Sequence, residues 1–367
     1  MADINKDRLF TLFREMAGIS SPSWKEGEMI AYLERYAAKN GIHFRKIPCG
    51  ESYNVVMKVD GNAEGKKSLL FSGHTDTVTP CDNITVIENE TKFTTDGSTV
   101  LGADDKAGLA AILEGVQSIV ESGAQRGTVE LLFTCAEEVG LRGMKDMDMS
   151  AVSPDYSFVL DSGGPIGSVC IQAPYHTIMK ITVNGKAAHA GMEPEKGVSA
   201  IAAAAGMINA LKTGRIDEET TANIGTITGG KATNIVAPEA YFDLEIRSLD
   251  KKKLASLEKE FKETIRNTAK EHGARVKIDR YLEYAGYTVK KNAPIMRLFR
   301  KACESIQLVP HYEASGGGSD TNILNAAKHQ AINLSCGMAK VHTTSEYIKK
   351  SDLVKTARLV AALIESA

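Results

Sequence analysis

Histidine and carboxylate side chains follow three short apolar segments of this chain, each at the point where the segment ends. These side chains are His74, Asp76, Glu137, Glu138 and Asp161. Imidazole and carboxylate ligands without thiolates suit zinc, with cobalt or manganese as substitutes. Short apolar segments bounded by turn residues are typical of buried strands, and open α/β sheets bind ligands at the carboxyl ends of their strands. The pattern therefore predicts a metal-dependent active site at one edge of a sheet.

His74 and Asp76 form the first pair of interest. Residues i and i+2 of a strand share a face, so both side chains point the same way. A metal-bound histidine usually donates its other ring N–H to a carboxylate or carbonyl group, which fixes its tautomer, and Asp76 is spaced for that role. An isolated pair of this kind is more often a hydrogen-bonded histidine beside a turn aspartate. The pair therefore indicates a metal site only together with the other carboxylates.

Asp104 and Asp105 lie in the segment 102–108, directly before an apolar helical stripe. Acidic residues in the first turn of a helix are common and favourable without any ligand. The functional alternative is that one carboxylate bridges two cations, with one oxygen on each.

Glu137, Glu138 and Asp161 also have two interpretations. Adjacent glutamates after a strand usually mark a solvated turn. Because adjacent side chains diverge, one glutamate can instead bind a metal while its neighbour acts as a general base. Asp161 precedes a glycine-rich turn and is either a turn residue or another ligand.

The elements that must position these residues alternate between strand and helix. The first group comprises helical patterning over 10–36 interrupted at 20–23, strands near 52–59, 68–72, 128–134 and 156–160, and an amphipathic helix from Leu109. The second group comprises strands 176–183, 223–228, 240–247 and 275–281 with helices 194–211 and 254–265. The third comprises helices 295–306 and 352–365, a glycine-rich loop at 315–320 and a strand at 331–334.

This order predicts an α/β fold with a mixed, mostly parallel sheet flanked by helices, interrupted by an inserted α+β domain. The inserted strand–helix–strand–strand–helix–strand order is ferredoxin-like. We expect a first catalytic part at 1–174, an inserted domain at 175–288 and a second catalytic part at 289–367.

Composition narrows the class of protein. The chain has 367 residues and a formal net charge of −2, which argues against bulk attraction to nucleic acid or anionic membrane. Its six scattered cysteines form no C-x-x-C pair, so free buried thiols are expected. No apolar export segment opens the chain, and no uncharged stretch reaches the roughly 20 residues of a membrane span. A cytoplasmic location is expected.

Taken together, the motifs resemble a known family. They occur in the order Gly73–Asp76, Gly102–Gly108, Glu137–Gly140, Asp161, Ala188–Gly191 and His342. The ordered set resembles the co-catalytic zinc metallopeptidase family that includes peptidase T, carboxypeptidase G, dipeptidases and succinyl-diaminopimelate desuccinylase. The resemblance covers nearly the whole chain and is nearest to peptidase T because of segment 102–108.

The resemblance implies a two-zinc site and a mechanism. The implied ligands are His74 and Asp161 for one zinc, Glu138 and His342 for the other, and Asp104 as the bridge. Asp76 would orient His74, and Glu137 would take a proton from a water shared by the zincs, generating a hydroxide that attacks the amide carbonyl. The family also implies a cis peptide bond after the bridging aspartate.

The resemblance further implies how substrate is held. His189 would stabilise the oxyanion, often from a partner subunit, which implies domain closure and a homodimer through the inserted domain. The implied substrate contacts are Asn234, Arg247, Gly317 and Gly318. Arg247 suits a peptide carboxylate because its planar group binds two oxygens at once, although a solvated arginine at a strand end explains it as well.

The leading hypothesis is a dinuclear zinc aminopeptidase that hydrolyses the N-terminal peptide bond of short peptides. An N-acyl amino acid deacylase or a dipeptidase with the same metals is the alternative, because specificity pockets rather than zinc ligands separate these activities. A non-catalytic metal-dependent binding protein is a distant third, since Glu137 and every implied ligand are present. No G-x-G-x-x-G follows a first strand, which disfavours a dinucleotide enzyme.

Overall fold

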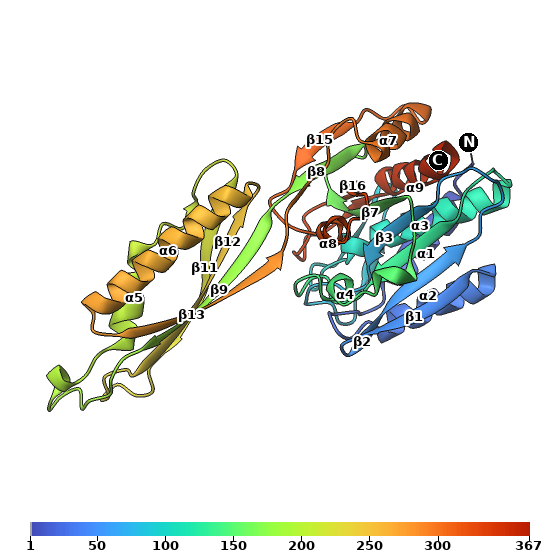
Figure 1. Cartoon of the computed structure of the whole chain (residues 1–367). Helices are drawn as coiled ribbons and strands as arrows, with labels where there is room; N and C mark the ends of the chain where they lie inside the picture. Colours follow the sequence, from blue (N-terminus) through green and yellow to red (C-terminus); the bar gives the residue numbers. More distant parts are fainter. Residues whose placement is uncertain (1) are drawn as a thin grey trace. The chain divides into compact units, whose positions relative to one another are not determined.

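The computed structural model describes residues 2–367, which form two compact units. Unit 1 is formed by the chain up to Ile171 together with Thr288–Ala314 and Ser319–Ala367, and unit 2 by Gln172–Tyr287 and Ser315–Gly318. Both ends of the chain belong to unit 1, where the Ala2 N–H donates a hydrogen bond to Glu365 Oε1 at 2.8 Å (Figure 1).

Unit 1 is built on a nine-stranded sheet with the order β1-β2-β6-β3-β7-β16-β8-β14, in which β15 also pairs with β8. The strands are β1 (His43–Cys49), β2 (Ser52–Val59), β3 (Leu69–His74), β6 (Val129–Thr134), β7 (Tyr156–Gly163), β8 (Ser168–Ala173), β14 (Tyr287–Thr288), β15 (His311–Ala314) and β16 (Ala331–Met338). The four central strands β6, β3, β7 and β16 run parallel. Their carboxyl ends therefore meet at one edge of the sheet.

Helices cover both faces of this sheet, because alternate residues of each strand enter different cores. Leu69 and Phe71 belong to the larger core, and Leu70 to a smaller one. The larger core is covered by α1 (Lys6–Ala17), α2 (Gly27–Asn40), α3 (Ala103–Ser122), α7 (Pro294–Ser305) and α9 (Lys350–Ser366), and the smaller by α4 (Arg142–Lys145) and α8 (Asp320–Ala326). A small sheet of β4 (Val86–Glu88), β5 (Lys92–Thr95) and β17 (Ile348–Lys349) completes the unit. The expected α/β class is confirmed.

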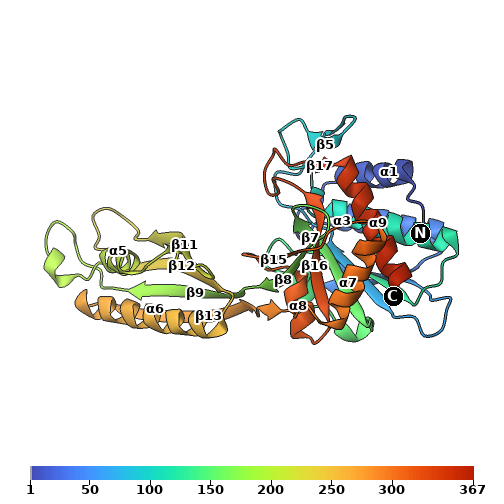
Figure 2. The ribbon, with the colours of Figure 1, turned by 90° about the horizontal axis from the view of Figure 1, so that it is seen from above.

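The contact between α3 and α9, which lie side by side (Figure 2), depends on a glycine. A Cβ at Gly115 would lie 2.7 Å from Val360 Cβ and 2.8 Å from the Ala357 carbonyl oxygen. In Gly115→Ala, overpacking costs about 1–3 kcal/mol and the higher helix propensity of alanine returns about 1 kcal/mol. The free energy of unfolding should therefore fall by up to about 2 kcal/mol. Urea unfolding checks this. Gly27→Ala, whose Cβ would meet nothing within 4 Å, is the control, and a stabilised Gly115→Ala would contradict the packing argument.

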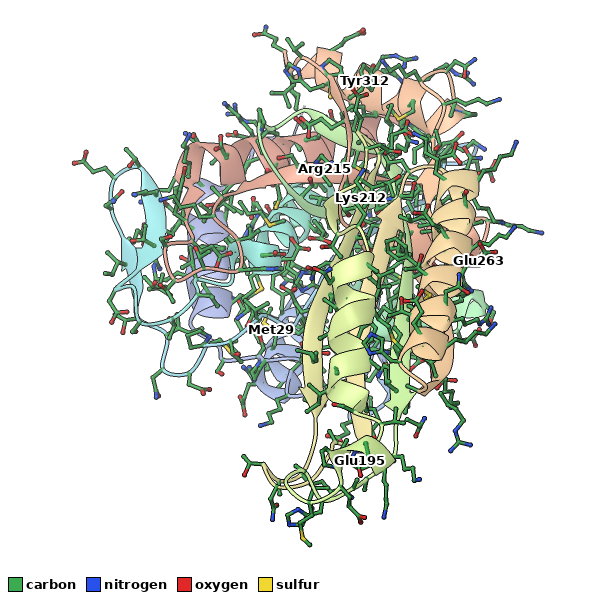
Figure 3. All side chains as sticks on the ribbon, turned by 90° about the vertical axis from the view of Figure 1, so that its left-hand side faces the viewer. Met29, Glu195, Lys212, Arg215, Glu263 and Tyr312 are labelled. Carbon is green, nitrogen blue, oxygen red and sulfur yellow. The ribbon has the colours of Figure 1, made fainter. Side chains whose placement is uncertain are left out.

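Unit 2 contains a five-stranded antiparallel sheet with the order β10-β11-β12-β9-β13. Its strands are β9 (Tyr175–Asn184), β10 (Gly214–Arg215), β11 (Thr220–Gly229), β12 (Glu239–Ser248) and β13 (Arg275–Tyr284). Helices α5 (Ala200–Ala210) and α6 (Lys251–Glu271) lie side by side on one face (Figure 3). The order β9-α5-β11-β12-α6-β13 is the expected ferredoxin-like arrangement.

The predicted helix over 194–211 is wrong in its first part. Pro194–Lys196 forms a short 3₁₀ helix, and α5 begins only at Ala200, after Ser199. Between them, Val198 exchanges two backbone hydrogen bonds with Lys186, at 2.8 and 2.9 Å. Pairing with a distant segment therefore overrides the local helical tendency of this region.

Two further expectations concern the cysteines and the membrane. All six cysteines are free and buried, as predicted. Among residues 2–367, none of the helices combines the length and apolar character that crossing a bilayer requires.

Candidate metal centre

Three adjacent parallel strands deliver the side chains that the sequence singles out. His74 is the last residue of β3 and pairs with Thr134, the last residue of β6. Glu137 and Glu138 lie in the turn after β6, and Asp161 lies in the carboxyl-terminal half of β7. Because β3 lies between β6 and β7, these side chains gather at one edge of the sheet.

Asp104, near the start of α3, lies between two histidines. Its Oδ1 is 3.0 Å from His74 Nε2, and its Oδ2 is 3.2 Å from His342 Nε2. The Asp104–Asp105 peptide bond is cis, as the resemblance implies. Each oxygen of one carboxylate therefore faces a different imidazole.

The remaining carboxylates are arranged around the same two histidines. Glu138 Oε2 lies 3.0 Å from His342 Nε2, and Asp161 Oδ1 lies 3.9 Å from His74 Nε2. His342 comes from the loop after β16 and has a left-handed backbone with φ of 61°. All five residues that the resemblance implies as ligands are thus brought together within unit 1.

Asp76 holds His74 and the turn at Glu137 and Glu138 in place by hydrogen bonds. Its backbone oxygen lies 2.9 Å and its carboxylate 3.4 Å from His74 Nδ1. The carboxylate also accepts the N–H groups of Glu137 at 2.9 Å and Glu138 at 3.2 Å, and the hydroxyl of Ser23 at 2.7 Å. With an acceptor at Nδ1, the imidazole keeps a proton there, so Nε2 is the ring nitrogen left to face the cluster.

The cluster concentrates negative charge. Burial and then the repulsion of Asp104 raise the pKa of Asp161 well above its usual value, and burial and Asp161 do the same to the pKa of Glu137. Burial opposes ionisation of Asp104, but hydrogen bonds to the two histidines outweigh it and lower its pKa. Hydrogen bonds to Asp104 and Glu138 raise the pKa of His342 to about 10. Without a metal ion, protons must therefore balance the cluster's charge.

The donor set fits divalent cations. Two overlapping groups have ligand atoms within 4.8 Å of one another: His74, Asp104 and Glu138, and His74, Asp105 and Asp161. Glu138 Oε1 is buried and finds no hydrogen-bond partner among residues 2–367, although a buried carboxylate oxygen normally has one. Nitrogen and oxygen donors without a thiolate are the ligands expected for zinc, cobalt or manganese.

Two buried carboxyl groups near the cluster were not identified from sequence. Glu346 accepts a hydrogen bond from the Asp104 N–H at 2.9 Å, and burial raises its pKa to about 7. Asp320 accepts one from Thr134 Oγ1 at 2.6 Å, and burial raises its pKa to about 6. Glu346 lies in no recognisable motif, and Asp320 ends the glycine-rich segment 315–320, whose pattern indicates only a loop, so the fold alone places them near the cluster.

The loop between α1 and α2 also supports the site, although its sequence indicates only a turn. Besides Ser23, it contributes Glu26, whose Oε1 accepts the Ala136 N–H at 2.9 Å. Ala136 precedes Glu137 and has a left-handed backbone, with φ of 48°. Glu26 thus holds the bend that directs the two glutamates.

Unit 2 carries the implied substrate contacts in two separate places. His189 and Asn234 lie close together, since the Ala190 N–H donates to the Asn234 carbonyl oxygen at 3.0 Å. They lie at the end of the sheet where Asn184 pairs with Glu239. In Figure 3 this end carries Glu195, from the short 3₁₀ helix after His189.

Arg247 lies at the other end of that sheet. It pairs in register with His176, and its Nη2 contacts Glu245 Oε2 at 3.1 Å. A Cβ on Gly317 would lie 4.0 Å from Arg247 Nη1, while Gly318 packs against the ring of Tyr284. The nine residues from Glu239 to Arg247 span about 26 Å of strand, so the two groups are far apart within unit 2.

Known proteins resemble this chain over almost its whole length. Peptidase family M20/M25/M40 matches residues 70–366. The uncharacterized protein YqjE of Bacillus subtilis is 35% identical over 369 residues, covering 99% of each chain. The crystal structure of an aminopeptidase PepT from Bacillus cereus is 35% identical with a TM-score of 0.90 and covers 99% of each chain. That of a tripeptidase from Staphylococcus aureus is 32% identical with a TM-score of 0.93, covering 99% of this chain and 98% of the other. This chain belongs to peptidase family M20/M25/M40 and is a peptidase T-like enzyme.

Proposed function

We propose that this protein is a two-zinc aminopeptidase that removes the N-terminal residue from short peptides. The observation that carries the proposal is the position of Asp104, whose two oxygens lie 3.0 and 3.2 Å from the Nε2 atoms of two different histidines. A carboxylate with an imidazole on each side suits a bridge between two cations. The similarity to an aminopeptidase and to a tripeptidase supports the substrate class.

The proposed ligands follow from these contacts and from the donor chemistry. One cation would be held by His74 and Asp161, the other by Glu138 and His342, and both by Asp104. Zinc is proposed, with cobalt or manganese able to replace it. When bound, such ions lower the pKa of water and polarise the scissile carbonyl group.

Glu137 is the proposed general base. Its backbone N–H is held by Asp76, which also lies against His74 and thus links the base to a ligand. The carboxylate of Glu137 would take the proton of the attacking water and return it to the leaving amine. Asp76 would keep His74 in the tautomer that presents Nε2, without contacting substrate itself.

The geometry of unit 2 supports a homodimer. A tripeptide spans roughly 10 Å when extended, whereas His189 and Arg247 lie at opposite ends of a sheet about 26 Å long. One peptide therefore cannot contact both residues of a single chain. We propose that Asn234, Arg247, Gly317 and Gly318 bind substrate and that His189 of one protomer stabilises the oxyanion at its partner's site.

A peptide panel tests the substrate class. The zinc-loaded protein should hydrolyse a free tripeptide, releasing its N-terminal residue, and should lose this activity when the α-amine is acetylated. Product analysis by mass spectrometry identifies the bond cleaved. Faster hydrolysis of N-acetyl or N-succinyl amino acids would instead support the deacylase. Exclusive cleavage of dipeptides would support the dipeptidase. Two bound zincs with no turnover of any substrate would support the non-catalytic binding protein.

Metal binding should release protons. His342 has a pKa raised to about 10, so its imidazole is protonated at pH 7.5 and must lose that proton to become a ligand. Affinity for the cation at Glu138 and His342 should therefore rise about tenfold per pH unit, a dependence that ends as pH approaches about 10. Calorimetry at pH 7.5 in two buffers of different ionisation enthalpy should show at least one proton released. Affinity independent of pH would contradict the proposed ligand.

A further inference from the structure

Glu346 is a buried carboxylate that no part of the proposed chemistry uses. It follows His342 by four residues and is 2% exposed. Its Oε2 accepts the backbone N–H groups of Leu101 at 2.8 Å and Gly102 at 2.7 Å, and its Oε1 accepts that of Asp104 at 2.9 Å. Both oxygens therefore bind one short segment that lies more than 240 residues earlier in the chain.

That segment is not held by ordinary helical hydrogen bonds. Gly102 has a left-handed backbone with φ of 70°, and Asp104 has the non-helical angles φ −82° and ψ 100°. The first N–H groups of a helix have no acceptor inside it and need one from elsewhere. Glu346 supplies it, so its carboxylate fixes the backbone from which the Asp104 side chain projects.

The same residue also fixes the loop that carries His342. This loop closes where Ala339 and Tyr347 exchange two backbone hydrogen bonds of 3.1 Å, and where the Glu346 N–H donates to the Thr343 carbonyl oxygen at 3.1 Å. Within it, the side chain of His342 is 52% exposed and so receives little packing support. Glu346 therefore belongs to the loop that carries one proposed ligand, His342, and supports another, Asp104, by a hydrogen bond to its backbone.

We infer that Glu346 is a positioning residue that sets the separation of Asp104 and His342 and thereby the affinity for the cation that Glu138 and His342 bind. This inference rests on the proposed function. The Asp161 side of the site has a support of its own, because the Asn333 amide donates to the Asp161 carbonyl oxygen at 2.7 Å and accepts the Asp161 N–H at 3.1 Å. Asp104 serves both cations but His342 serves only one, so loss of Glu346 should weaken the cation at Glu138 and His342 more than the other.

Glu346→Gln tests this inference. Glutamine keeps the shape but replaces one accepting oxygen by an NH₂ group that opposes backbone N–H donors. Removing the partner of a metal ligand typically costs 10–100-fold in metal affinity. Zinc competition against a chromophoric chelator, with the metal-free full-length protein, should show one binding step weakened by about 10–100-fold and the other weakened clearly less. Raising the zinc concentration should then restore kcat while KM stays close to wild type.

Glu130→Gln is the matched control. Glu130 is also a buried carboxylate, 7% exposed, and accepts the Ser153 N–H at 3.0 Å, but it lies near the start of β6, away from the cluster. Its variant should bind both zincs as wild type does. If Glu346→Gln binds both normally, or weakens both steps equally, the inference is overturned while the proposed function stands. A wild-type protein that takes up fewer than two zincs would overturn the proposed function as well.

Hydrogen exchange gives a second test that needs no variant. In the metal-free wild-type protein the amides of Leu101, Gly102 and Asp104 should be protected, because each donates a hydrogen bond to a side chain of the protein, Glu346. Exchange of these amides at the rate of an open loop would overturn the inference even if Glu346→Gln fails to fold.

Discussion

Replacing Glu137 by glutamine should leave both zinc ions bound and lower kcat by about 10²–10⁴-fold, the range that general base catalysis contributes. The amide has nearly the shape of the carboxylate but accepts no proton from the attacking water. The backbone N–H of residue 137 can still bond to Asp76 at 2.9 Å, so the turn that places Glu138 is preserved. The measurement is the steady-state kinetics of tripeptide hydrolysis combined with metal content by mass spectrometry.

Two outcomes of the Glu137→Gln experiment would count against the assignment. A kcat within threefold of wild type would remove Glu137 from the mechanism. A loss of zinc would make Glu137 a ligand instead of a base. Glu130→Gln, on the strand that precedes this turn but remote from the cluster, should retain the kcat of wild type and controls for a general effect of losing a buried carboxylate.

Asp104→Asn should have the second large effect, because it removes the proposed bridge. Asparagine offers one oxygen where aspartate offers two. It can therefore bind only one of the two cations, either the one beside His74 or the one beside His342. We expect one zinc to bind at least about 100-fold more weakly and peptide cleavage to fall with it. Removing a residue that only hydrogen-bonds to a metal ligand already lowers metal affinity by about 10–100-fold, and Asp104 is itself a proposed ligand. Zinc competition and tripeptide hydrolysis measure the two effects.

Asp105 provides the matched control for Asp104. It is adjacent to Asp104 in the chain and fully buried, and its Oδ2 accepts the backbone N–H of His74 at 3.3 Å. Burial and the repulsion of Asp161 raise its pKa well above the usual value, so the neutral amide of Asp105→Asn is a mild change. This variant should keep two zincs. If Asp105→Asn loses a zinc and Asp104→Asn does not, the bridge has been assigned to the wrong aspartate.

Much of the fold was predictable because local sequence and tertiary structure agree. The apolar run over 68–71 is a central strand buried on both faces, and its end at His74 was marked by the change from apolar to polar residues. The same holds for β6 and β7, so the strand-end histidine and carboxylates were found from pattern alone. His342 and the division of ligands between two cations came only from the resemblance, because no strand or helix pattern marks that loop.

Other features depend on contacts between distant segments, which local patterns cannot show. Glu346 has a role only because the fold brings residues 101–104 against it. Glu26 resembles any helix-start acid until its bond to the Ala136 N–H is seen. Residues 194–199 read as helix in isolation, but the pairing of Val198 with Lys186 makes part of this segment extended.

The central claim is that two cations and Glu137 together cleave the first peptide bond of a short peptide. Its most direct test is a zinc titration of the metal-free protein during hydrolysis of an unblocked tripeptide, with the released residue identified. The account predicts no cleavage without zinc, a maximum at two zincs per chain, and release of the N-terminal residue. Full activity without metal, a maximum at one zinc, or release of the C-terminal residue would contradict it.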